Sequence, residues 1–302
     1  MSVAILGSLN MDIVLSVGHL PRPGETISGA KLAHFPGGKG SNQAIASARL
    51  GSPTSLIGAV GRDAFGETLL AYLNESGVRT DAVARLEGEA TGQAFICVAR
   101  DGENSIVVVP GANHAISPAS VAGAAPGKHR VFLSQLEVPV EAVEAFFSSP
   151  AAKAGIRILN AAPSVVAARS LFGHPDYLIV NETELAAFAG AATPLDEPAE
   201  IARLARTLIA RSGQAVVVTL GKMGAVAVTW QKLLEYAGYN VKVRDTTGAG
   251  DCFCGALASA LDSGQPIDSA MRFANAAAAI STTRPGGGPS MPTRSEVAEI
   301  LE

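Results

Sequence analysis

The chain has 302 residues, a length that fits one large α/β domain or two smaller ones. A formal net charge of −4 and an aromatic content of 5% argue against nucleic acid and anionic membranes as partners, because neither electrostatic attraction nor base stacking is provided. No apolar run approaches the ~20 residues of a membrane span, and the first residues lack the cationic start of a signal peptide. Cys97, Cys252 and Cys254 do not form a secreted disulfide pattern, so a cytoplasmic location is expected.

Strand and helix patterns alternate through most of the chain. Short runs rich in apolar and β-branched residues predict strands, and apolar residues at helical spacing predict helices between several of them. The strands are expected at Val3–Gly7, Ser55–Val60, Val131–Ser134, Ile156–Asn160, Tyr177–Val180, Ala215–Leu220 and Ala225–Thr229, and the helices at Gly40–Leu50, Asp63–Ser76, Pro139–Phe147, Glu182–Ala189 and Pro198–Ser212. This order predicts an α/β fold with a mostly parallel sheet covered on both faces.

Two segments interrupt the alternation. Ile13–Lys31 and Gln93–Val109 look like strand pairs without a helix between them, and together they predict a small antiparallel flap. The chain ends with helices expected at Gly250–Ser263, Asp268–Thr282 and Thr293–Leu301. Since no repeat or linker marks a boundary, residues 1–302 are predicted to form one domain.

A glycine-containing turn stands at the start of the first of these last helices, where Gly248, Ala249 and Gly250 precede Asp251. A helix start leaves several N–H groups without partners, and glycines let an oxyanion approach them. A carboxylate beside such a cradle can take a proton from a substrate hydroxyl while the amides stabilise a transferring phosphoryl group. The alternative is an ordinary tight turn in which Asp251 caps the helix.

Other motifs for nucleotides and metals are missing from the sequence. It contains neither G-x4-G-K-[ST] nor an early G-x-G-x-x-G, which argues against a P-loop nucleotidase and a dinucleotide-binding site. The five histidines form no H-x3-H pair, and Cys252 and Cys254 would point to nearly opposite faces of a helix, so no structural zinc is predicted.

Several segments, in the same order, resemble the ribokinase-like carbohydrate kinase family across essentially the whole chain. They are "GSLNMDIVLSVGHLPRPGETISG" (7–29), "PGGKGSNQAIASARLG" (36–51), "VVPGAN" (108–113), "QLEVP" (135–139), "NETE" (181–184), "TLGKMG" (219–224), "DTTGAGD" (245–251) and "RPGGGPSMP" (284–292). The resemblance implies an ATP-dependent sugar kinase with a doubly wound α/β body and a small β-sheet lid that often forms a dimer contact. In that family Asp251 would be the general base, and Gly248, Ala249 and Gly250 would form the anion hole.

The implied reaction phosphorylates the primary hydroxyl of a pentose, with D-ribose to D-ribose 5-phosphate favoured by Asp12, Glu137 and the segment 39–42. Alternatives are another sugar (deoxyribose, fructose or a keto-deoxy sugar acid), a nucleoside, or a sugar-binding regulator without catalysis. A homodimer formed through the lid is the implied assembly.

Residues for the sugar are expected near the first strand. Asn10 and Asp12 follow it, at the edge where open α/β sheets bind ligands, and they can fork onto vicinal hydroxyls unless they only form an Asx turn. The resemblance adds Gly38, Lys39 and Asn42 from "GGKGSN" and Glu137 from "QLEVP". A solvated helix-start lysine and a plain helix glutamate are the alternatives for Lys39 and Glu137.

Residues for MgATP are implied farther along the chain. Asn181 and Glu184 lie three apart, on one face of a predicted helix, and the resemblance gives this pair a water-mediated role at the Mg²⁺-bound phosphates. A surface helix is the alternative. The resemblance also implies nucleotide contacts at Thr219, Gly221, Gly224, Gly250 and Asn275, the last of which could otherwise be a plain helix-face amide.

A monovalent cation, K⁺, is implied beside the anion hole. Its surroundings by resemblance are Asp245, Thr247, Ser281, Arg284, Gly286 and Ser290. Gly287 and Gly288 stand where the family usually has Ala and Gln, and Pro285 follows Arg284, which puts the affinity for the ion in question. The segment 228–245 lacks the usual hairpin turn, so a different shape is expected for the loop on the adenine side.

Overall fold

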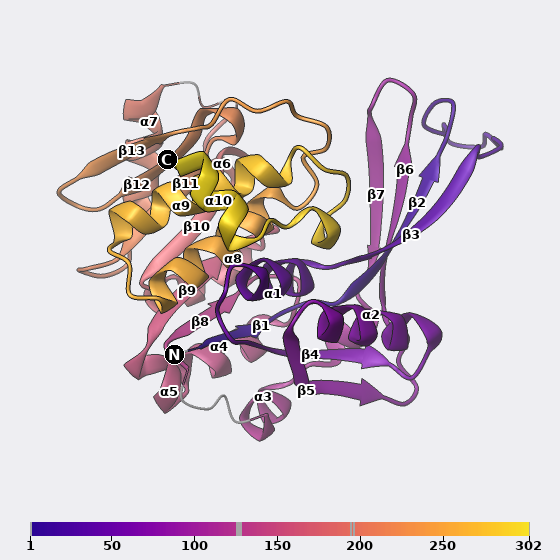
Figure 1. The fold of residues 1–302 in the computed structure, drawn as a ribbon, viewed down its shortest axis with the longest axis horizontal. Helices are drawn as coiled ribbons and strands as arrows, with labels where there is room; N and C mark the ends of the chain where they lie inside the picture. The colour runs from indigo at the N-terminus through magenta and orange to yellow at the C-terminus, as the bar shows by residue number, and fades with distance from the viewer. Residues whose placement is uncertain (1, 125–128, 194, 196, 302) are drawn as a thin grey trace.

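The computed structural model describes residues 2–124, 129–193, 195 and 197–301, and its main feature is a nine-stranded sheet (Figure 1). The strand order is β13-β12-β11-β10-β9-β8-β1-β4-β5. The parallel strands are β1 (Val3–Leu6), β4 (Thr54–Gly61), β5 (Val78–Leu86), β8 (Val131–Ser134), β9 (Ile156–Asn160), β10 (Tyr177–Asn181) and β11 (Ala215–Thr219); β12 (Gly224–Val228) and β13 (Leu233–Ala237) add an antiparallel edge. The predicted α/β class is confirmed.

Helices cover both faces of this sheet, as predicted. One face packs against α1 (Lys39–Arg49), α2 (Ala64–Glu75), α8 (Ala249–Asp262), α9 (Ile267–Ser281) and α10 (Arg294–Leu301); the other packs against α3 (Pro118–Gly123), α4 (Val140–Ser148), α5 (Pro150–Ala154), α6 (Glu182–Ala189) and α7 (Pro198–Thr207). A hydrophobic core lies on each face of the sheet. In β1, the side chains of Val3 and Ile5 pack into the core on the first face, and those of Ala4 and Leu6 pack into the core on the other face. Alternate burial on two faces explains why these strands are apolar throughout.

A second sheet of four strands projects from the body (Figure 1). Its order is β3-β2-β6-β7, with β2 at Asn10–Ser16, β3 at Lys31–Gly37, β6 at Gly92–Val98 and β7 at Asn104–Val109. The prediction for its first half needs correction, because β3 starts at Lys31 instead of ending there. Pro21, Pro23 and Gly24 lie between the two strands, and prolines cannot donate to a ladder. The sheet is also mixed, since β2 and β6 run parallel.

The link from the body to the second sheet is short. β1 ends at Leu6 and β2 begins at Asn10, so Gly7–Leu9 carry the chain from one sheet to the other. The start of α1 passes against this link. A Cβ on Gly40 would lie 2.5 Å from the carbonyl carbon of Gly7, so only glycine permits the contact.

The segment 228–245, where a loop shape different from the family's is expected, contains β13. β12 and β13 form a hairpin, and the N–H of Thr229 donates to the carbonyl of Lys232 over 2.9 Å at its turn.

Among the described helices, none combines the length and apolar composition that crossing a membrane requires.

Candidate active site

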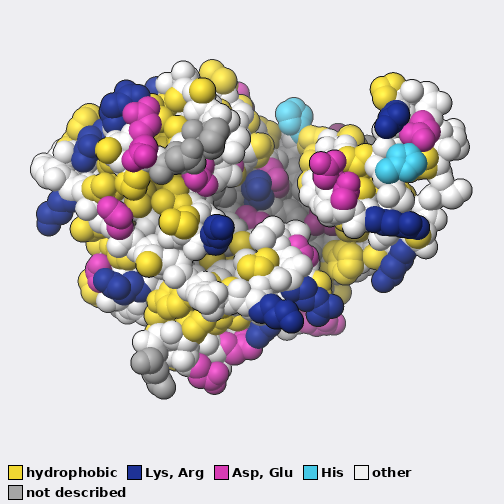
Figure 2. Space-filling view, turned by 90° about the horizontal axis from the view of Figure 1, so that it is seen from above, with side chains coloured by type: hydrophobic (Ala, Val, Ile, Leu, Met, Phe, Trp, Pro, Cys, Tyr) yellow, Lys and Arg dark blue, Asp and Glu magenta, His cyan; other side chains and the backbone are white. Residues whose placement is uncertain are grey.

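The predicted site residues lie where parallel strands of the large sheet end and where α1 and α8 begin. Figure 2 shows a hollow between the body and the projecting sheet, with acidic and basic side chains on its floor. Ligands of open α/β sheets bind at this edge, because the loops that follow adjacent strands separate there.

Asp251 is the third residue of α8 and is only 7% exposed. Its Oδ2 accepts a hydrogen bond from Nδ2 of Asn42 (3.0 Å), and its Oδ1 accepts one from Nε2 of Gln43 (2.9 Å). Gly248 is the residue before the helix, in the left-handed conformation (φ 74°), and no side chain caps the helix start. The alternative in which Asp251 is the cap of an ordinary turn is therefore excluded.

The start of α8 is open to a ligand. The N–H groups of Gly250 and Asp251, in the first turn, have no acceptor within the helix. Gly250 is exposed, and a Cβ built on it would meet nothing within 4 Å. A negatively charged group can therefore approach amides that carry the positive end of the helix dipole.

Glu137 joins the loop after β8 to the start of α1. Its Oε2 accepts from Oγ of Ser8 (2.5 Å) and from the N–H of Lys39 (3.2 Å), and its Oε1 lies 4.0 Å from Nζ of Lys39. Burial lowers the pKa of the Lys39 ammonium, but the charges of Asp251, Glu137 and Glu184 outweigh it and leave that pKa raised. Lys39 is therefore a permanent cation among acidic groups, which excludes the solvated-lysine alternative.

Asp12 lies in β2 on the other side of this cluster. Burial, together with the nearby charges of Glu137 and Asp251, raises the pKa of Asp12 to about 7, and Lys39 opposes the shift. A Cβ on Gly37 in the paired strand would lie 2.2 Å from Oδ2 of Asp12, so a side chain there would displace the Asp12 carboxyl group. Asp12 is thus a half-buried carboxyl group that changes charge near neutral pH.

Asn10 is held by Asn113, a residue of the "VVPGAN" segment for which the sequence indicated no role. Nδ2 of Asn113 donates to Oδ1 of Asn10 over 2.8 Å and to the carbonyl of Leu9 over 3.0 Å, and its Oδ1 accepts from the N–H of Leu9 over 2.9 Å. Gly38 (φ 89°) completes the group, because a Cβ there would lie 2.7 Å from the backbone nitrogen of Asn10. The structure therefore brings the predicted sugar residues together, from β2, the start of α1 and the loop after β8.

A group of buried carboxamide side chains next to Asp251 was also not predicted from the sequence. Gln43 donates to Oδ1 of Asn160 over 3.1 Å in addition to Asp251, and Oε1 of Gln43 accepts from Nε2 of Gln135 over 2.7 Å. These residues belong to α1, the end of β9 and the residue after β8. Their partners are far apart in sequence, so no local pattern could have identified them.

Two residues predicted for the nucleotide, Asn181 and Thr219, lie at the ends of β10 and β11 and pair in register. Asn181 and Glu184 form a capping box: the N–H of Glu184 donates to Oδ1 of Asn181 (2.8 Å), and the N–H of Asn181 donates to Oε2 of Glu184 (2.9 Å). Burial raises the pKa of Glu184, the hydrogen bond from Asn181 and the charge of Lys39 lower it, and the net shift is upward. The pair thus has a structural role, and the box uses only Oε2 of Glu184.

The turn after β11 contains two of the predicted glycines, both with positive φ (Gly221, 54°; Gly224, 99°). A Cβ on Gly224 would lie 2.1 Å from the carbonyl oxygen of Tyr236 in β13. Asn275 of α9 is 6% exposed, and its Nδ2 donates to that same oxygen over 3.1 Å. Gly224 and Asn275 therefore fix the β12–β13 hairpin against the body.

The segments predicted for K⁺ are neighbours. Oδ2 of Asp245 accepts from the N–H of Gly286 (2.7 Å), and Oδ1 accepts from the N–H of Thr247 (2.9 Å). Oγ of Ser281 donates to the carbonyl of Ala278 within α9 (2.7 Å), and Oγ of Ser290 donates to the carbonyl of Gly287 within the loop (2.7 Å), so both hydroxyls have local partners. The guanidinium of Arg284 pairs with Glu296 and so does not contribute to the predicted ion site. Backbone carbonyl oxygens are therefore the atoms of this loop that could bind a cation.

Gly287 and Gly288, the departures from the family pattern, permit close packing of this loop on α1. A Cβ on Gly287 would lie 2.9 Å from Nδ2 of Asn42, and one on Gly288 would lie 2.9 Å from Cδ1 of Ile45. Nη1 of Arg49 then donates to the carbonyls of Gly288, Pro289 and Met291 at 3.1–3.3 Å. The loop is thereby attached to the helix that supplies Lys39 and Asn42.

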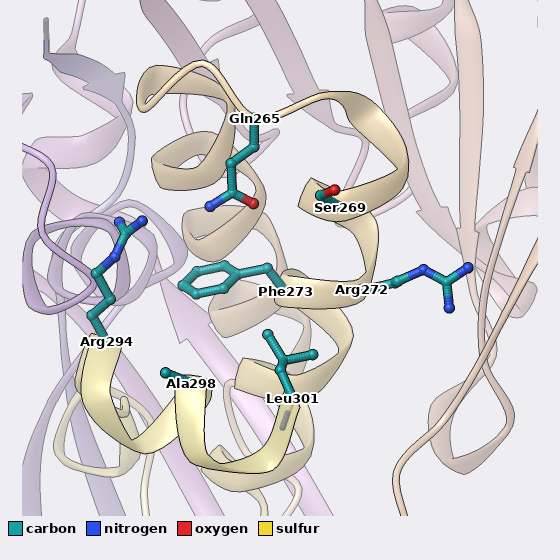
Figure 3. Close-up of a pocket in the computed structure, with 7 residues that line it drawn as sticks. All are labelled: Gln265, Ser269, Arg272, Phe273, Arg294, Ala298 and Leu301. Carbon is teal, nitrogen blue, oxygen red and sulfur yellow. The ribbon is translucent and has the colours of Figure 1, made fainter.

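A separate pocket lies between α9 and α10, away from all of these residues (Figure 3). Its lining consists of Gln265, Ser269, Arg272, Phe273, Arg294, Ala298 and Leu301. The guanidinium of Arg294 stands 5.6 Å from the centre of the Phe273 ring and so covers part of the apolar surface.

Within the part of the chain that the structure describes, no group of three His, Cys, Asp or Glu residues is arranged to hold a metal ion.

Comparisons with known proteins agree with one another. A family model described as pfkB family carbohydrate kinase matches residues 1–294. A ribokinase from Haemophilus influenzae is 37% identical over 304 residues, covering 100% of this chain and 98% of the relative, and a deoxyribokinase from Salmonella typhi is 32% identical over 305 residues, covering 100% and 99%.

Solved structures match over the same length. A ribokinase from Thermotoga maritima superposes with a TM-score of 0.90 at 33% identity, covering 100% of this chain and 99% of that one. A ribokinase from Arabidopsis thaliana, complexed with ribose and ATP, gives a TM-score of 0.86 at 31% identity and covers 100% and 98%.

Proposed function

This chain belongs to the pfkB family of carbohydrate kinases, and on that premise we propose that it transfers the γ-phosphoryl group of ATP to the primary hydroxyl of D-ribose, giving D-ribose 5-phosphate. The observation that carries the proposal is the position of Asp251: a buried carboxylate, fixed at both oxygens, in the first turn of a helix where the amides of Gly250 and Asp251 have no acceptor within the helix. Base and anion site are thus adjacent, as phosphoryl transfer requires.

In the proposed reaction, Asp251 accepts the proton of the sugar hydroxyl as its oxygen attacks the γ-phosphorus in line. The bond from phosphorus to the oxygen that bridges the β- and γ-phosphates breaks, and ADP leaves with that electron pair. The amides of Gly248, Ala249 and Gly250 would face the transferring group and stabilise its charge, and the N–H of Ala249 would leave the carbonyl of Thr246, to which it donates over 3.2 Å. What supports this role is the open space at Gly250, which a bulky oxyanion can enter.

The sugar is proposed to lie among Asn10, Asp12, Lys39, Asn42 and Glu137, with Gly38 giving it close access to the backbone. Carboxylates accept from sugar hydroxyls, while the ammonium and the carboxamides donate, so vicinal hydroxyls can be bound from both sides. We name ribose as the proposed substrate because the ribokinase relative is 37% identical and the Arabidopsis relative binds ribose.

The nucleotide is proposed to lie over the ends of β10 and β11, with Thr219, Gly221 and Gly224 on one side and Asn275 behind the adenine. Oε1 of Glu184 lies outside the capping box and can hold a water of the Mg²⁺ shell. Mg²⁺ would neutralise charge on the phosphates. K⁺ is proposed between the segments 245–247 and 281–290, where it would stiffen the anion hole; the carbonyls of the second segment suit a hard, weakly hydrated ion.

The projecting sheet is proposed to act as a lid over the hollow and as the contact between two copies of the chain. A lid excludes water, which would otherwise accept the phosphoryl group. Phe95 and Val107 are paired across β6 and β7, on the face opposite to Asp12, and are 38% and 62% exposed. Apolar side chains exposed on a sheet face support burial against a second copy.

The decisive experiment mixes purified protein with MgATP and a panel of pentoses and hexoses, with and without K⁺, and identifies products by mass. We expect a singly phosphorylated ribose, formed faster with K⁺. The deoxyribokinase relative makes 2-deoxyribose the second candidate, and a higher kcat/KM for that sugar would replace ribose in the proposal. ATP turnover without a sugar phosphate, or no turnover at all, would exclude a sugar kinase and favour a sugar-binding regulator.

A further inference from the structure

A chain of buried amides connects the carboxylate of Asp251 to the strands behind it. Gln43 and Gln135 are both 0% exposed, so no substrate can reach either side chain. Gln43 donates to Asp251 and Asn160 through the same Nε2 atom, and its Oε1 accepts from Nε2 of Gln135. Asp251, at the start of α8, is thereby attached through α1 to the ends of β8 and β9.

The charge on Asp251 fixes the direction of every amide in this chain. An ionised carboxylate only accepts hydrogen bonds, so Gln43 must turn its NH2 group toward Asp251. Its carbonyl oxygen then faces Gln135, which must donate. Reversing the Gln43 amide would place oxygen against the carboxylate and NH2 against the NH2 of Gln135, and both contacts would be repulsive. Asp251 therefore sets the orientation of Gln43, and the NH2 group of Gln135 stabilises Gln43 in that orientation only.

We propose that Gln43 is a positioning residue of the phosphoryl transfer: with Asn42 it fixes the carboxylate plane of Asp251, and Gln135 fixes Gln43. The inference rests on the proposed function, since it assumes that Asp251 is the base. With one oxygen held by Asn42 at 3.0 Å and the other by Gln43 at 2.9 Å, the side chain has no freedom to rotate. Base catalysis depends on such alignment, and a displacement of about 1 Å can cost ~100-fold in rate.

The first test replaces Gln43 by Met, which keeps the volume and removes the three hydrogen bonds of the side chain, to Asp251, Asn160 and Gln135. We expect kcat to fall by about 10- to 100-fold while KM for ribose and for MgATP stays within about threefold, because neither substrate touches Gln43. Gln214→Met is the matched control. Gln214 is 1% exposed, and its Nε2 donates to the carbonyls of Phe172 (2.6 Å) and Pro175 (2.9 Å), far from the site. This control is expected to lower Tm and to leave kcat per folded molecule unchanged.

The second test replaces Gln135 by Met and combines the two changes. Gln135 does not touch Asp251, so a merely structural role would lower Tm without changing kcat per folded molecule. We expect a smaller loss of kcat than in Gln43→Met, and no further loss in the double variant, since both changes act through the same contact with Asp251. If the losses of kcat in the two single variants added up in the double variant, the proposal that Gln135 acts through Gln43 would be overturned. If Gln43→Met does not fold, unchanged kcat in Gln135→Met overturns it alone.

The wild-type protein in the same assay separates the two proposals. If the wild-type protein is active and the Gln43→Met variant has the same kcat, the positioning role is overturned and the kinase proposal stays intact. A loss in Gln43→Met that raises KM as much as it lowers kcat also overturns it. Wild type that phosphorylates no sugar overturns the proposed function and this inference with it.

Discussion

Nδ2 of Asn42 lies 3.0 Å from Oδ2 of Asp251, and this hydrogen bond joins the first turn of α1 to the first turn of α8. Asn42 also lies against Gly287, where a Cβ would approach its carboxamide to 2.9 Å. One side chain thus contacts the proposed base and the loop proposed to bind K⁺. Sugar contacts, base and ion loop are therefore parts of one packed unit.

Replacing Asp251 by Asn is expected to lower kcat by about 100-fold or more, since a general base contributes 10²–10⁴-fold. The Kd for sugar should stay within about threefold, because the neighbouring donors and carboxylates remain. ADP release and calorimetric titration measure the two quantities. Asp262→Asn, at the other end of α8 and 3% exposed, is the control and should keep kcat. A kcat within tenfold of wild type in Asp251→Asn would show that another group takes the proton.

Asp12 should make stability depend on pH in an unusual direction. Its pKa is about 7 in the folded chain against 3.8 as the ordinary value, so folding disfavours its ionised form. The free energy of unfolding therefore falls as pH rises from about 4 through 7, and the loss is complete above pH 7. We expect Asp12→Asn to be more stable than wild type at pH 8, by a few degrees in Tm, and the difference to shrink toward pH 4.

Thermal unfolding of both proteins at pH 4, 6 and 8 measures this difference. Asp81→Asn, whose side chain is 81% exposed, is the control and should shift Tm little at any of these pH values. An Asp12→Asn variant with the same Tm difference at pH 4 and pH 8 would contradict the raised pKa.

Alanine at Gly250 and at Gly248 should have opposite effects on stability. Gly250 has space for a methyl group and lies within a helix, where Ala is favoured over Gly by up to about 1 kcal/mol. Gly248 has φ 74°, and its Cβ would lie 2.9 Å from Cα of Gly287, so Gly248→Ala should cost about 1–2 kcal/mol. Yet Gly250→Ala should lower kcat/KM for MgATP by more than about 10-fold, since the methyl group takes the place of a phosphate oxygen.

Denaturant unfolding and initial rates measure these two effects in the same preparations. A stable and fully active Gly250→Ala protein would place the transferring phosphoryl group elsewhere.

A lysine on the outer face of the projecting sheet should weaken the proposed dimer. In Val107→Lys a charge would be buried between the two copies, which costs several kcal/mol without a partner. Analytical ultracentrifugation should show a shift toward monomer. Val166→Lys, at a side chain 78% exposed outside the lid, is the control and should leave the dimer intact. Wild-type protein that is a monomer at all concentrations, or Val107→Lys protein that dimerises normally, would exclude this lid face as the contact.

The strands were predictable from the sequence except at the edges of the sheets, and among the helices the short α3 and α5 were not predicted. β5 and β13 were not predicted, and both are outermost strands with several exposed or half-buried residues. An edge strand faces solvent along one side, so its sequence carries a weaker apolar signal than a central strand such as β8, which is fully buried. The start of β3 was missed for a related reason, because most of its residues are exposed.

The residues of the candidate site were predictable where they stand at a strand end or helix start. Asn10, Asp12 and Asp251 belong to that group. Asn113, Gln43 and Gln135 do not, because each acts on a residue about 100 or more positions away and nothing local distinguishes it from another core amide. Two predicted residues, Asn181 and Asn275, have structural contacts that a motif alone could not reveal.

The brevity of Gly7–Leu9 has a mechanical consequence. β1 is clamped between β4 and β8, while β2 is the second strand of the sheet proposed as a lid, so a movement of that sheet would bend the chain within this link, as well as in its other connections to the body, such as Gly38 between β3 and α1. Asn10 and Asp12 lie directly beyond the pivot, where displacement is smallest, whereas the tips of the hairpins sweep the widest arc. The contacts proposed for the sugar would thus stay nearly constant while the proposed lid opens and closes the entrance.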